Sequence, residues 1–580
     1  MTEVRSRSSG QTALLRELER VLEEIGGPPG FEPVLERPRD PQHGDYATNA
    51  ALVLARGLGT PPRVLAERIA RAFDRRARRV ATVEVAGPGF LNFRVADALI
   101  WEEVASILAA DRAWGRSRTP EPEKVNVEFV SANPTGPLHV AHGRGAALGD
   151  AIASLLEWTG HEVSREFYVN DAGRQVDLLA ESIEARFQER RGIAGAVPEG
   201  GYHGEYVAEL ADEIAEREGP SRLESMHREE RLALFRDRAV AALREGQERD
   251  LERFGVKMDV FRRESDLYSE RRIESVLRQL EAEGLTYERD GAVWLKTAEL
   301  GDEKDRVLVK RDGSYTYFAP DIGYHVDKAE RGFDRAIDIW GADHHSHVRR
   351  MQAALSALGL PDFLEVVILQ LVRVLRAGVE AKMSKRAGTF VALRELLEET
   401  GRDVARYFFL MRRAEAQLNF DLDLALDTSE ANPVYRVQYA HARMCSVFAR
   451  GQVDVRSLSA TRDGLERLDT EAERRVAKAL LRFPEVVRSA AEARAPHQVC
   501  TYLEETANLV NGWYHEGNLN RDARILAEGP TRNGRLKLAR ATQITLRNGL
   551  GLLGLDAPRA MLRDEGERKS GACQRTGGTT

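Results

Sequence analysis

The fold is decided by one stretch of the sequence, Ser131-Ala132-Asn133-Pro134-Thr135-Gly136-Pro137-Leu138-His139-Val140-Ala141-His142. It follows an apolar run of β type, Val125 to Val130, and leads into a helical pattern, so we expect a turn between a strand and a helix. Turn amides and helix N-termini favour anions. In open α/β sheets the ligand crevice lies beyond the carboxyl ends of the strands. The stretch therefore predicts a phosphate-binding turn at the edge of a parallel sheet.

A second informative segment lies far downstream and reads Lys382-Met383-Ser384-Lys385-Arg386. Two lysines flanking a serine suit a loop that stabilises the charge of a triphosphate in a transition state. Together the two segments resemble the HIGH and KMSKS signatures of class I aminoacyl-tRNA synthetases. In that class both signatures bind ATP. The resemblance implies that Ser384 binds ATP. It also implies four catalytic, ATP-binding residues, His139, His142, Lys382 and Lys385.

One residue departs from the first signature, because Ala141 stands where the class has glycine. Its methyl group would either crowd the approach of the adenine to the backbone or be absorbed by a small shift. The expected roles of the two histidines do not depend on this position.

A third segment, Gly341-Ala342-Asp343, follows the strand-like run Ala336 to Trp340. It resembles the Gly-x-Asp turn of the same class, which implies that Gly341 and Asp343 bind the ribose of ATP. A zinc site is the alternative, because histidines and carboxylates cluster here. Adjacent histidines on a turn point in different directions, however, so we expect no protein-held metal. The residues concerned are Asp343, His344, His345 and His347.

Length and composition limit the class of protein. The chain has 580 residues, too many for one hydrophobic core, with 42% hydrophobic and 31% charged residues. It has no long apolar span, and its N-terminus is polar, so we expect neither membrane insertion nor secretion but a cytoplasmic protein. Its three cysteines, Cys445, Cys500 and Cys573, lie far apart, which argues against a structural zinc site or a disulfide framework.

The alternation of strand-like and helical runs after Val125 predicts an α/β fold with a Rossmann-like parallel-sheet catalytic domain. We expect this domain at residues 119–426, with a helical insertion at about 176–262. An N-terminal α+β module at 1–118 precedes it, and a C-terminal all-α helical bundle at 427–561 follows. Residues 562–580 are polar and rich in Gly, Ser and Thr, and we expect them to be a disordered tail.

Four longer strings narrow the resemblance to the bacterial arginyl-tRNA synthetases, over Leu15 to Met561. They are Gly44–Ala50, Ala86–Phe93, Tyr315–Asp321 and Asn432–Arg443. The resemblance implies an arginine–tRNA ligase that makes arginyl-adenylate and pyrophosphate from L-arginine and ATP with Mg²⁺. It then transfers arginine to the 3′-terminal ribose of tRNA(Arg), its macromolecular partner, with the 2′-hydroxyl as first acceptor. We expect a monomer.

The chemistry of arginine fits this assignment. A guanidinium has five donors and a permanent charge, so its pocket should offer carboxylates and planar acceptors. The resemblance implies that the arginine-binding residues are Glu128, Asn133, Tyr317 and Asp321. Either carboxylate could accept a bidentate pair of hydrogen bonds. Tyr317 would pack on the substrate, and Asn133 would bind its α-amino end.

The C-terminal region is also expected to bind tRNA. Residues 431–560 hold 20 Lys and Arg against 14 Asp and Glu, which favours local attraction to a polyanion, although a solvated helix face is the alternative. Aromatic side chains with basic neighbours suit unstacked bases, while helix-core packing competes for each tyrosine. The candidates for bases are Tyr435, Arg436, Tyr439 and Arg443, and those for phosphate are Arg532, Arg535, Lys537 and Arg540.

Two alternative functions remain at this level. One is another class I synthetase, such as the cysteinyl type, which the missing zinc ligands and the acidic pocket oppose. The other is a non-catalytic tRNA-binding paralogue. The intact histidines and lysines of both signatures oppose the paralogue, whereas Ala141 favours it.

Overall fold

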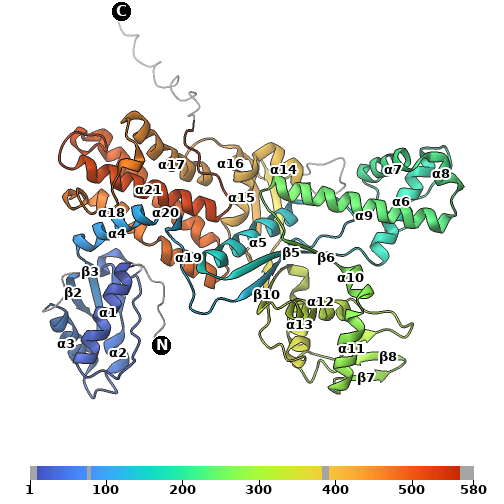
Figure 1. Ribbon diagram of the computed structural model, residues 1–580, viewed down its shortest axis with the longest axis horizontal. Coiled ribbons are helices and arrows are strands. Elements are labelled where there is room, and N and C mark those ends of the chain that lie inside the picture. Colours follow the sequence, from blue (N-terminus) through green and yellow to red (C-terminus); the bar gives the residue numbers. More distant parts are fainter. Residues whose placement is uncertain (1–8, 39, 75–79, 382–390, 562–580) are drawn as a thin grey trace, which may run out of the picture.

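The centre of the protein is a five-stranded parallel sheet. The computed structural model describes residues 9–38, 40–74, 80–381 and 391–561. Every neighbouring pair of strands in this sheet is parallel. The strand order is β11-β10-β4-β5-β6 (Figure 1), which confirms the predicted Rossmann-like fold class. The strands are β4 (Lys124–Glu128), β5 (Glu162–Val169), β6 (Val260–Arg263), β10 (Arg335–Gly341) and β11 (Leu364–Leu369).

Strand β4 sends alternate side chains to the two faces of the sheet, as a pleated strand must. Val125 and Val127 are buried in one hydrophobic core with helix α5 (Val140–Thr159). Gly149 lets α5 approach closely, because a Cβ atom there would lie 2.1 Å from the Phe129 ring. Glu128 points to the opposite face, which is covered by α12 (Phe318–Glu330) and α13 (His345–Ala357). The sheet is therefore covered by helices on both faces.

A helical insertion separates β5 from β6, as the sequence predicts. It comprises α6 (Arg174–Glu189), α7 (Glu205–Glu218), α8 (Pro220–Ser225) and α9 (Arg228–Arg253). These helices have a hydrophobic core of their own around Leu179, Ile183 and Phe235. In Figure 1 the insertion projects away from the sheet, and α9 runs back toward it.

The segment between β6 and β10 holds a small antiparallel sheet that the sequence patterns did not reveal. Its strands are β7 (Thr286–Arg289), β8 (Ala292–Leu295) and β9 (Arg306–Val309), in the order β7-β8-β9. Helices α10 (Glu264–Ser269) and α11 (Arg272–Ala282) precede it. The strands have only four residues each, which is too short for a clear alternation of polar and apolar residues.

After β11 the chain forms a third small sheet beside α5. Its strands are β12 (Val372–Arg376), β13 (Val379–Glu380) and β14 (Leu418–Asp421), in the order β13-β12-β14. The helices that accompany it are α14 (Leu393–Thr400), α15 (Arg402–Leu410) and α16 (Leu422–Leu426). Helix α15 packs directly on α5.

The N-terminal α+β module is a three-stranded antiparallel sheet with helices on it. Its elements are α1 (Ser9–Glu24), β1 (Tyr46–Thr48), α2 (Ala50–Leu54), α3 (Pro62–Asp74), β2 (Val80–Ala86) and β3 (Phe90–Val95). Helix α4 (Asp97–Ala110) follows it but packs on helices α18 (Glu471–Leu481) and α21 (Arg532–Leu552) of the C-terminal region. Arg474 bonds Asp97 at 3.0 Å across this contact.

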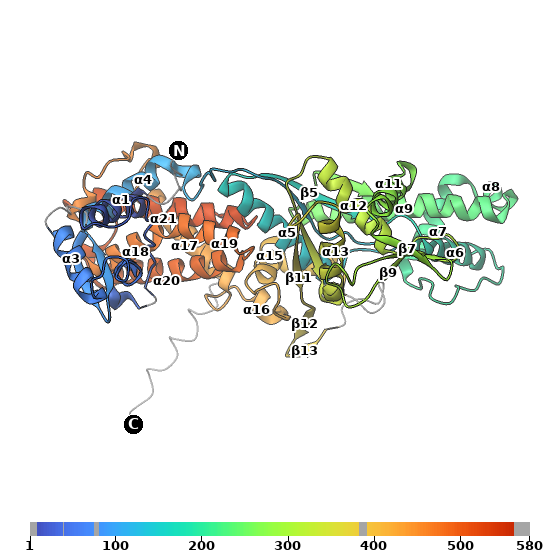
Figure 2. The same cartoon turned by 90° about the horizontal axis from the view of Figure 1, so that it is seen from below.

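The C-terminal region is all-helical in its described part, as predicted (Figure 2). Its helices are α17 (Pro433–Arg450), α18 (Glu471–Leu481), α19 (Phe483–Glu492), α20 (His497–Leu519) and α21 (Arg532–Leu552). The helical pattern over 465–491 is divided between α18 and α19, because Pro484, in the first turn of α19, has no amide hydrogen to continue the hydrogen bonds of α18. Among the described residues, no helix combines the length and apolar character needed to cross a bilayer.

Candidate active site

Most of the candidate site residues follow the carboxyl ends of parallel strands. Glu128 ends β4, and the turn to α5 carries Asn133, His139 and His142. Gly341 ends β10, and Asp343 follows it. Because these strands are parallel and adjacent, their carboxyl ends meet at one edge of the sheet, where α/β proteins bind ligands. The structure thus brings the predicted phosphate-binding turn and the predicted ribose turn to the same edge.

The turn after β4 has a strained backbone. The φ angle is 71° at Val130 and 38° at Ser131. Residues with a Cβ atom rarely adopt such values, and β-branched residues such as valine do so least of all. The Ser131 amide donates to the Phe129 carbonyl at 3.0 Å, which makes a γ-turn centred on Val130. Strain of this kind persists only where the surroundings hold it in place, and it is concentrated at functional sites.

The two histidines of the first signature stack at the start of α5. Their ring centroids lie 3.6 Å apart, and the His139 amide donates to Nδ1 of His142 at 3.3 Å. Nδ1 of a neutral His142 is therefore the acceptor, and Nε2 carries the proton. Burial lowers the pKa of His139, and burial together with the neighbouring His139 lowers the pKa of His142 to about 3. Both imidazoles are neutral donors near pH 7.

Lys382, Ser384 and Lys385 lie outside the described residues. The chain that follows them returns to the first signature, because the Val140 amide donates to the Val391 carbonyl at 3.1 Å. The Leu393 amide likewise donates to the Leu138 carbonyl at 2.8 Å. The described end of the downstream segment is therefore hydrogen-bonded to the turn that carries His139.

The turn after β10 is open to solvent. Asp343 lies in a short 3₁₀ turn, Ala342–His344, and its side chain is 82% exposed. His347, on α13, turns away from it and approaches Oδ2 of Asp321 at 3.0 Å. In the described part of the chain, no three His, Cys, Asp or Glu side chains are grouped so as to hold a metal ion.

Glu128 is buried and already bound. Lys328 donates to its Oε2 at 2.6 Å, and the Ser131 hydroxyl donates to its Oε1 at 2.8 Å. Lys328 is itself fully buried and also donates to Asp338 at 2.8 Å. Burial raises the pKa of Glu128, and the Lys328 ammonium opposes that effect. The charge of Glu128 is thus compensated from within the protein.

The other three predicted arginine-binding residues differ in exposure. Tyr317 is 79% exposed immediately before α12. Asp321, one turn later, is partly exposed, and its backbone carbonyl lies 2.7 Å from Nδ1 of His325. Asn133 is partly buried and donates to the Gln175 side chain at 2.6 Å. Asp321 is the predicted carboxylate whose charge no lysine or arginine contacts among the described ion pairs.

A further carboxylate near Asp321, Glu264, was missed by the sequence reasoning. It begins α10 directly after β6, is buried, and accepts a hydrogen bond from Tyr268 at 3.3 Å. Burial and the nearby carboxylates of Asp321 and Asp171 raise its pKa to about 7. Its position after a strand of the sheet was the available signal, but no motif marks it.

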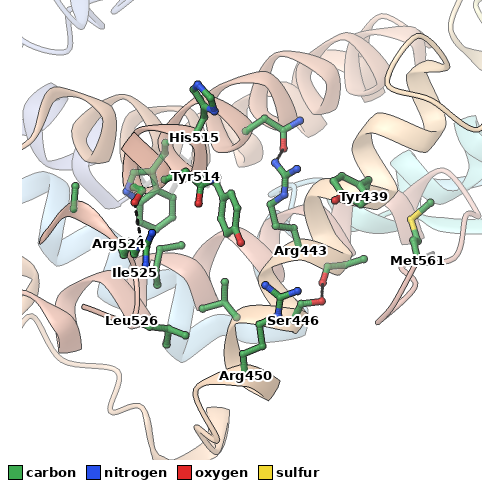
Figure 3. Close-up of a pocket in the computed structure, with 18 of the residues that line it drawn as sticks. Tyr439, Arg443, Ser446, Arg450, Tyr514, His515, Arg524, Ile525, Leu526 and Met561 are labelled. Carbon is green, nitrogen blue, oxygen red and sulfur yellow. Dashed lines mark hydrogen bonds between the residues drawn. The ribbon is translucent and has the colours of Figure 1, made fainter. Parts of the chain in front are cut away.

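A large cavity lies in the C-terminal helical region (Figure 3). Its volume is about 1110 Å³, and it is lined by α17, by α20 and by the chain near Ile525 and Met561. The Arg443 guanidinium lies over the Tyr439 ring at 4.6 Å and over the Tyr514 ring at 4.7 Å. Of the four predicted base-binding residues, Tyr439 and Arg443 line this cavity. Tyr435 stacks on Tyr439, and Arg436 donates to the Glu430 carbonyl.

Two of the cations expected to contact phosphate are buried instead, so that prediction is wrong for them. Arg535 donates to Glu473 at 2.7 Å inside the helical bundle. Lys537 is fully buried and donates to the carbonyls of Thr461 and Asp463. Arg540 bonds Asp111 beyond the end of α4. These side chains bond elements of the protein to one another rather than facing a polyanion.

Comparisons with known proteins identify the class to which the chain belongs. The family described as "tRNA synthetases class I (R), catalytic domain" matches residues 103–417. "Arginyl tRNA synthetase N terminal domain" matches 12–95, and "DALR anticodon binding domain" matches 437–561. The catalytic-domain match covers more than half of the chain and places it in class I of the aminoacyl-tRNA synthetases.

Individual relatives show which family of class I synthetases the chain belongs to. An arginine–tRNA ligase of Halalkalibacterium halodurans is 45% identical over 532 residues, covering 91% of this chain and 94% of the relative. That of Bacillus subtilis is 44% identical over 530 residues, with the same coverage. The structure of Thermus thermophilus arginyl-tRNA synthetase superposes with a TM-score of 0.72 at 25% identity, over 95% of this chain and all of that one. The chain belongs to the arginyl-tRNA synthetase family, which confirms the predicted resemblance.

Proposed function

We propose that this protein ligates arginine to tRNA(Arg) at the carboxyl edge of its parallel sheet. The observation that supports this most directly is the acidic pair Asp321 and Glu264, two carboxylates close enough to raise the pKa of Glu264. In a family of arginine–tRNA ligases, such a pair supplies what a guanidinium requires, namely acceptors of its planar donors and a compensating negative charge.

In the first step, the carboxylate of arginine attacks the α-phosphorus of ATP, and pyrophosphate leaves. Nε2 of neutral His142, together with His139, would donate hydrogen bonds to phosphate oxygens, and Gly341 and Asp343 would hold the ribose. Because neither imidazole is charged near pH 7, the positive charge must come from elsewhere. We assign it to Lys382, Lys385 and the Mg²⁺ that accompanies ATP, with Ser384 as a further donor.

For recognition of arginine, Asp321 and Glu264 would accept from the guanidinium, and Tyr317 would cover the substrate. Asn133 would hold the α-amino end. Glu128 would act indirectly, because both of its carboxylate oxygens are already hydrogen-bonded. Its bond to Ser131 would help to hold the strained turn that carries Asn133.

In the second step, the 2′-hydroxyl of the terminal ribose of tRNA attacks the arginyl carbonyl, and AMP leaves. The cavity of Figure 3 would take an unstacked anticodon base, since Arg443, Tyr439 and Tyr514 offer charge and flat faces. The match to an anticodon-binding domain over residues 437–561 supports this assignment. We further propose that the protein works in the cytoplasm as a monomer.

We also propose three domains, with one boundary moved. Helix α4 packs on α18 and α21, so the N-terminal module ends near residue 96 rather than 118. The catalytic domain would extend to 426, with its insertion ending before β6, and the helical domain from 427 to 561.

A charging assay tests the function directly. The purified protein is incubated with ATP, Mg²⁺, total tRNA and each of the twenty amino acids in turn. We expect arginyl-tRNA as the product. Formation of a different aminoacyl-tRNA would refute the arginine assignment, and tRNA binding without any charged product would identify a non-catalytic paralogue.

A further inference from the structure

The loop between β4 and α5 is held by the helical insertion. Three of the four helices of the insertion, α6, α7 and α9, each contribute one side chain that bonds residues 133–136. Gln175 of α6 bonds the Asn133 side chain. Tyr206 of α7 donates to the Thr135 carbonyl at 2.8 Å. Gln247 of α9 donates through Nε2 to the carbonyls of Asn133 at 3.1 Å and Gly136 at 2.9 Å.

The loop depends on such bonds because it has no regular structure of its own. It lies between the γ-turn at Val130 and the first turn of α5, and Pro134 and Pro137 remove two of its amide donors. Buried backbone carbonyls need donors. Those of Asn133 and Gly136 obtain them from Gln247, a residue distant in sequence. The path of the chain from β4 to His139 is therefore set partly by the insertion.

Gln247 is poorly placed for a purely stabilising role. It is 2% exposed, and its Oε1 has no hydrogen-bond partner among the described residues. A buried acceptor left unbonded costs folding free energy, which offsets part of what the two Nε2 bonds contribute. Gln247 is thus not bonded as fully as a purely stabilising amide would be, whereas its two bonds to the loop are specific.

Helix α9 is itself fixed against the catalytic domain by the same face. Asp250, three residues after Gln247, accepts from Arg394 of α14 at 2.9 Å. Helix α14 is hydrogen-bonded in turn to the β4–α5 connection through the Leu393 amide and the Leu138 carbonyl. Figure 1 shows α9 as a long helix that reaches from the insertion to α14. The face of α9 that carries Gln247 and Asp250 thus contacts both the β4–α5 loop and helix α14, which is itself hydrogen-bonded to that loop.

We propose that Gln247 and Tyr206 are positioning residues for adenylate formation, through which the helical insertion fixes residues 133–136 in their substrate-binding geometry. Neither side chain touches substrate. They act through Asn133, which would hold the α-amino group, and through the approach of the chain to His139. This inference rests on the proposed function of the site.

The test uses the full-length protein and arginine-dependent exchange of pyrophosphate into ATP, with tRNA(Arg) present. Gln247→Leu removes both donors at similar volume. We expect kcat/KM for arginine to fall by about 10²-fold, as for misplacement of a substrate-holding group by about 1 Å. Because the carbonyls of Asn133 and Gly136 lose their donor, we expect the midpoint of thermal unfolding to fall by only a few degrees, while the Kd for tRNA stays close to that of the wild type. A kcat/KM for arginine within twofold of the wild-type value would overturn the proposal.

A milder pair of variants guards against a folding defect. Tyr206→Phe removes only the hydroxyl that bonds Thr135, and we expect a smaller loss of activity. Tyr202→Phe is the matched control, because Tyr202 packs against the same insertion core and, within the described structure, its hydroxyl makes no hydrogen bond to the loop. If Tyr202→Phe lowers activity as much as Tyr206→Phe, the specific contact is not responsible.

Gln247→Glu adds a pH readout that packing alone would not give. A carboxylate would face two carbonyls, whereas its protonated form recovers one O–H donor. We expect the activity of this variant, relative to wild type, to rise as pH falls from 8 to 6. A constant ratio would contradict the proposal. An inactive wild-type protein would instead refute the proposed function, so the two failures are distinguishable.

Discussion

The affinity for arginine should depend on pH through Glu264. In the free protein, burial and two neighbouring carboxylates raise the pKa of this side chain to about 7. A guanidinium binds the ionised carboxylate and lowers its pKa, so arginine binding below pH 7 must release a proton. The affinity for arginine should therefore rise as the pH rises through 7 and level off above that value.

The magnitude follows from the same pKa. With a pKa of about 7, roughly one molecule in ten has an ionised Glu264 at pH 6, and about nine in ten at pH 8. The apparent Kd for arginine should therefore be about tenfold higher at pH 6 than at pH 8. Calorimetric titration in two buffers of different ionisation enthalpy measures both the Kd and the number of protons released. We expect close to one proton at pH 6 and close to none at pH 8.

Two variants make this prediction specific. Glu264→Gln should weaken arginine binding and abolish its pH dependence. Glu270→Gln, at the other end of α10, should leave the dependence intact, because hydrogen bonds from Arg262 and Arg272 lower the pKa of Glu270 to about 2. A Glu264→Gln protein with the same pH dependence as wild type would refute this account of Glu264.

Four further predictions concern the pocket, the downstream signature, the C-terminal cavity and the core. Asp321→Asn should raise the KM for arginine by about 10- to 100-fold, which is the value of one charge-assisted hydrogen bond. The KM for ATP should stay nearly constant in the same exchange assays. An equal rise in both KM values would show that Asp321 is not part of the arginine pocket. Lys385→Ala should lower kcat for activation by about 10²- to 10³-fold, and an unchanged rate would exclude this lysine from the mechanism. Arg443→Ala should raise the KM for tRNA about tenfold in aminoacylation assays without changing the KM for arginine, since a base would lose a stacking partner; an unaltered KM for tRNA would speak against the cavity. Arg406→Met should lower the free energy of unfolding by about 2 kcal/mol in urea titrations. Asp150 loses one buried donor but keeps Arg165, and the Leu553 carbonyl loses the other bond that Arg406 makes; a change below about 0.5 kcal/mol would contradict that account.

The fold was predictable because its strands have clear patterns. Val125 to Val130 is a largely buried run bounded by turn residues, and β4 (Lys124–Glu128) overlaps it. Helix α9 was predictable from its charged amphipathic pattern. The β7–β9 sheet was not, because its strands are too short to establish a period.

The site was predictable where a motif marks it and not elsewhere. His139 and Asp321 lie in strings of family-like sequence, whereas Glu264 is an isolated glutamate whose role depends on contacts made across the fold. The prediction that cations of α21 contact phosphate was wrong for Lys537. A sequence does not distinguish a solvated lysine from one that is buried against carbonyls. The contacts of Gln247 with the loop could not be foreseen either, since they join residues more than a hundred positions apart.

The central claim is that one edge of the parallel sheet holds arginine and ATP side by side. A crystal structure with a non-hydrolysable analogue of arginyl-adenylate tests it most directly. We expect the adenosine between His142 and Asp343, and the guanidinium within hydrogen-bond distance of both Asp321 and Glu264. A guanidinium placed away from both carboxylates, with the nucleotide bound elsewhere on the sheet, would contradict the account.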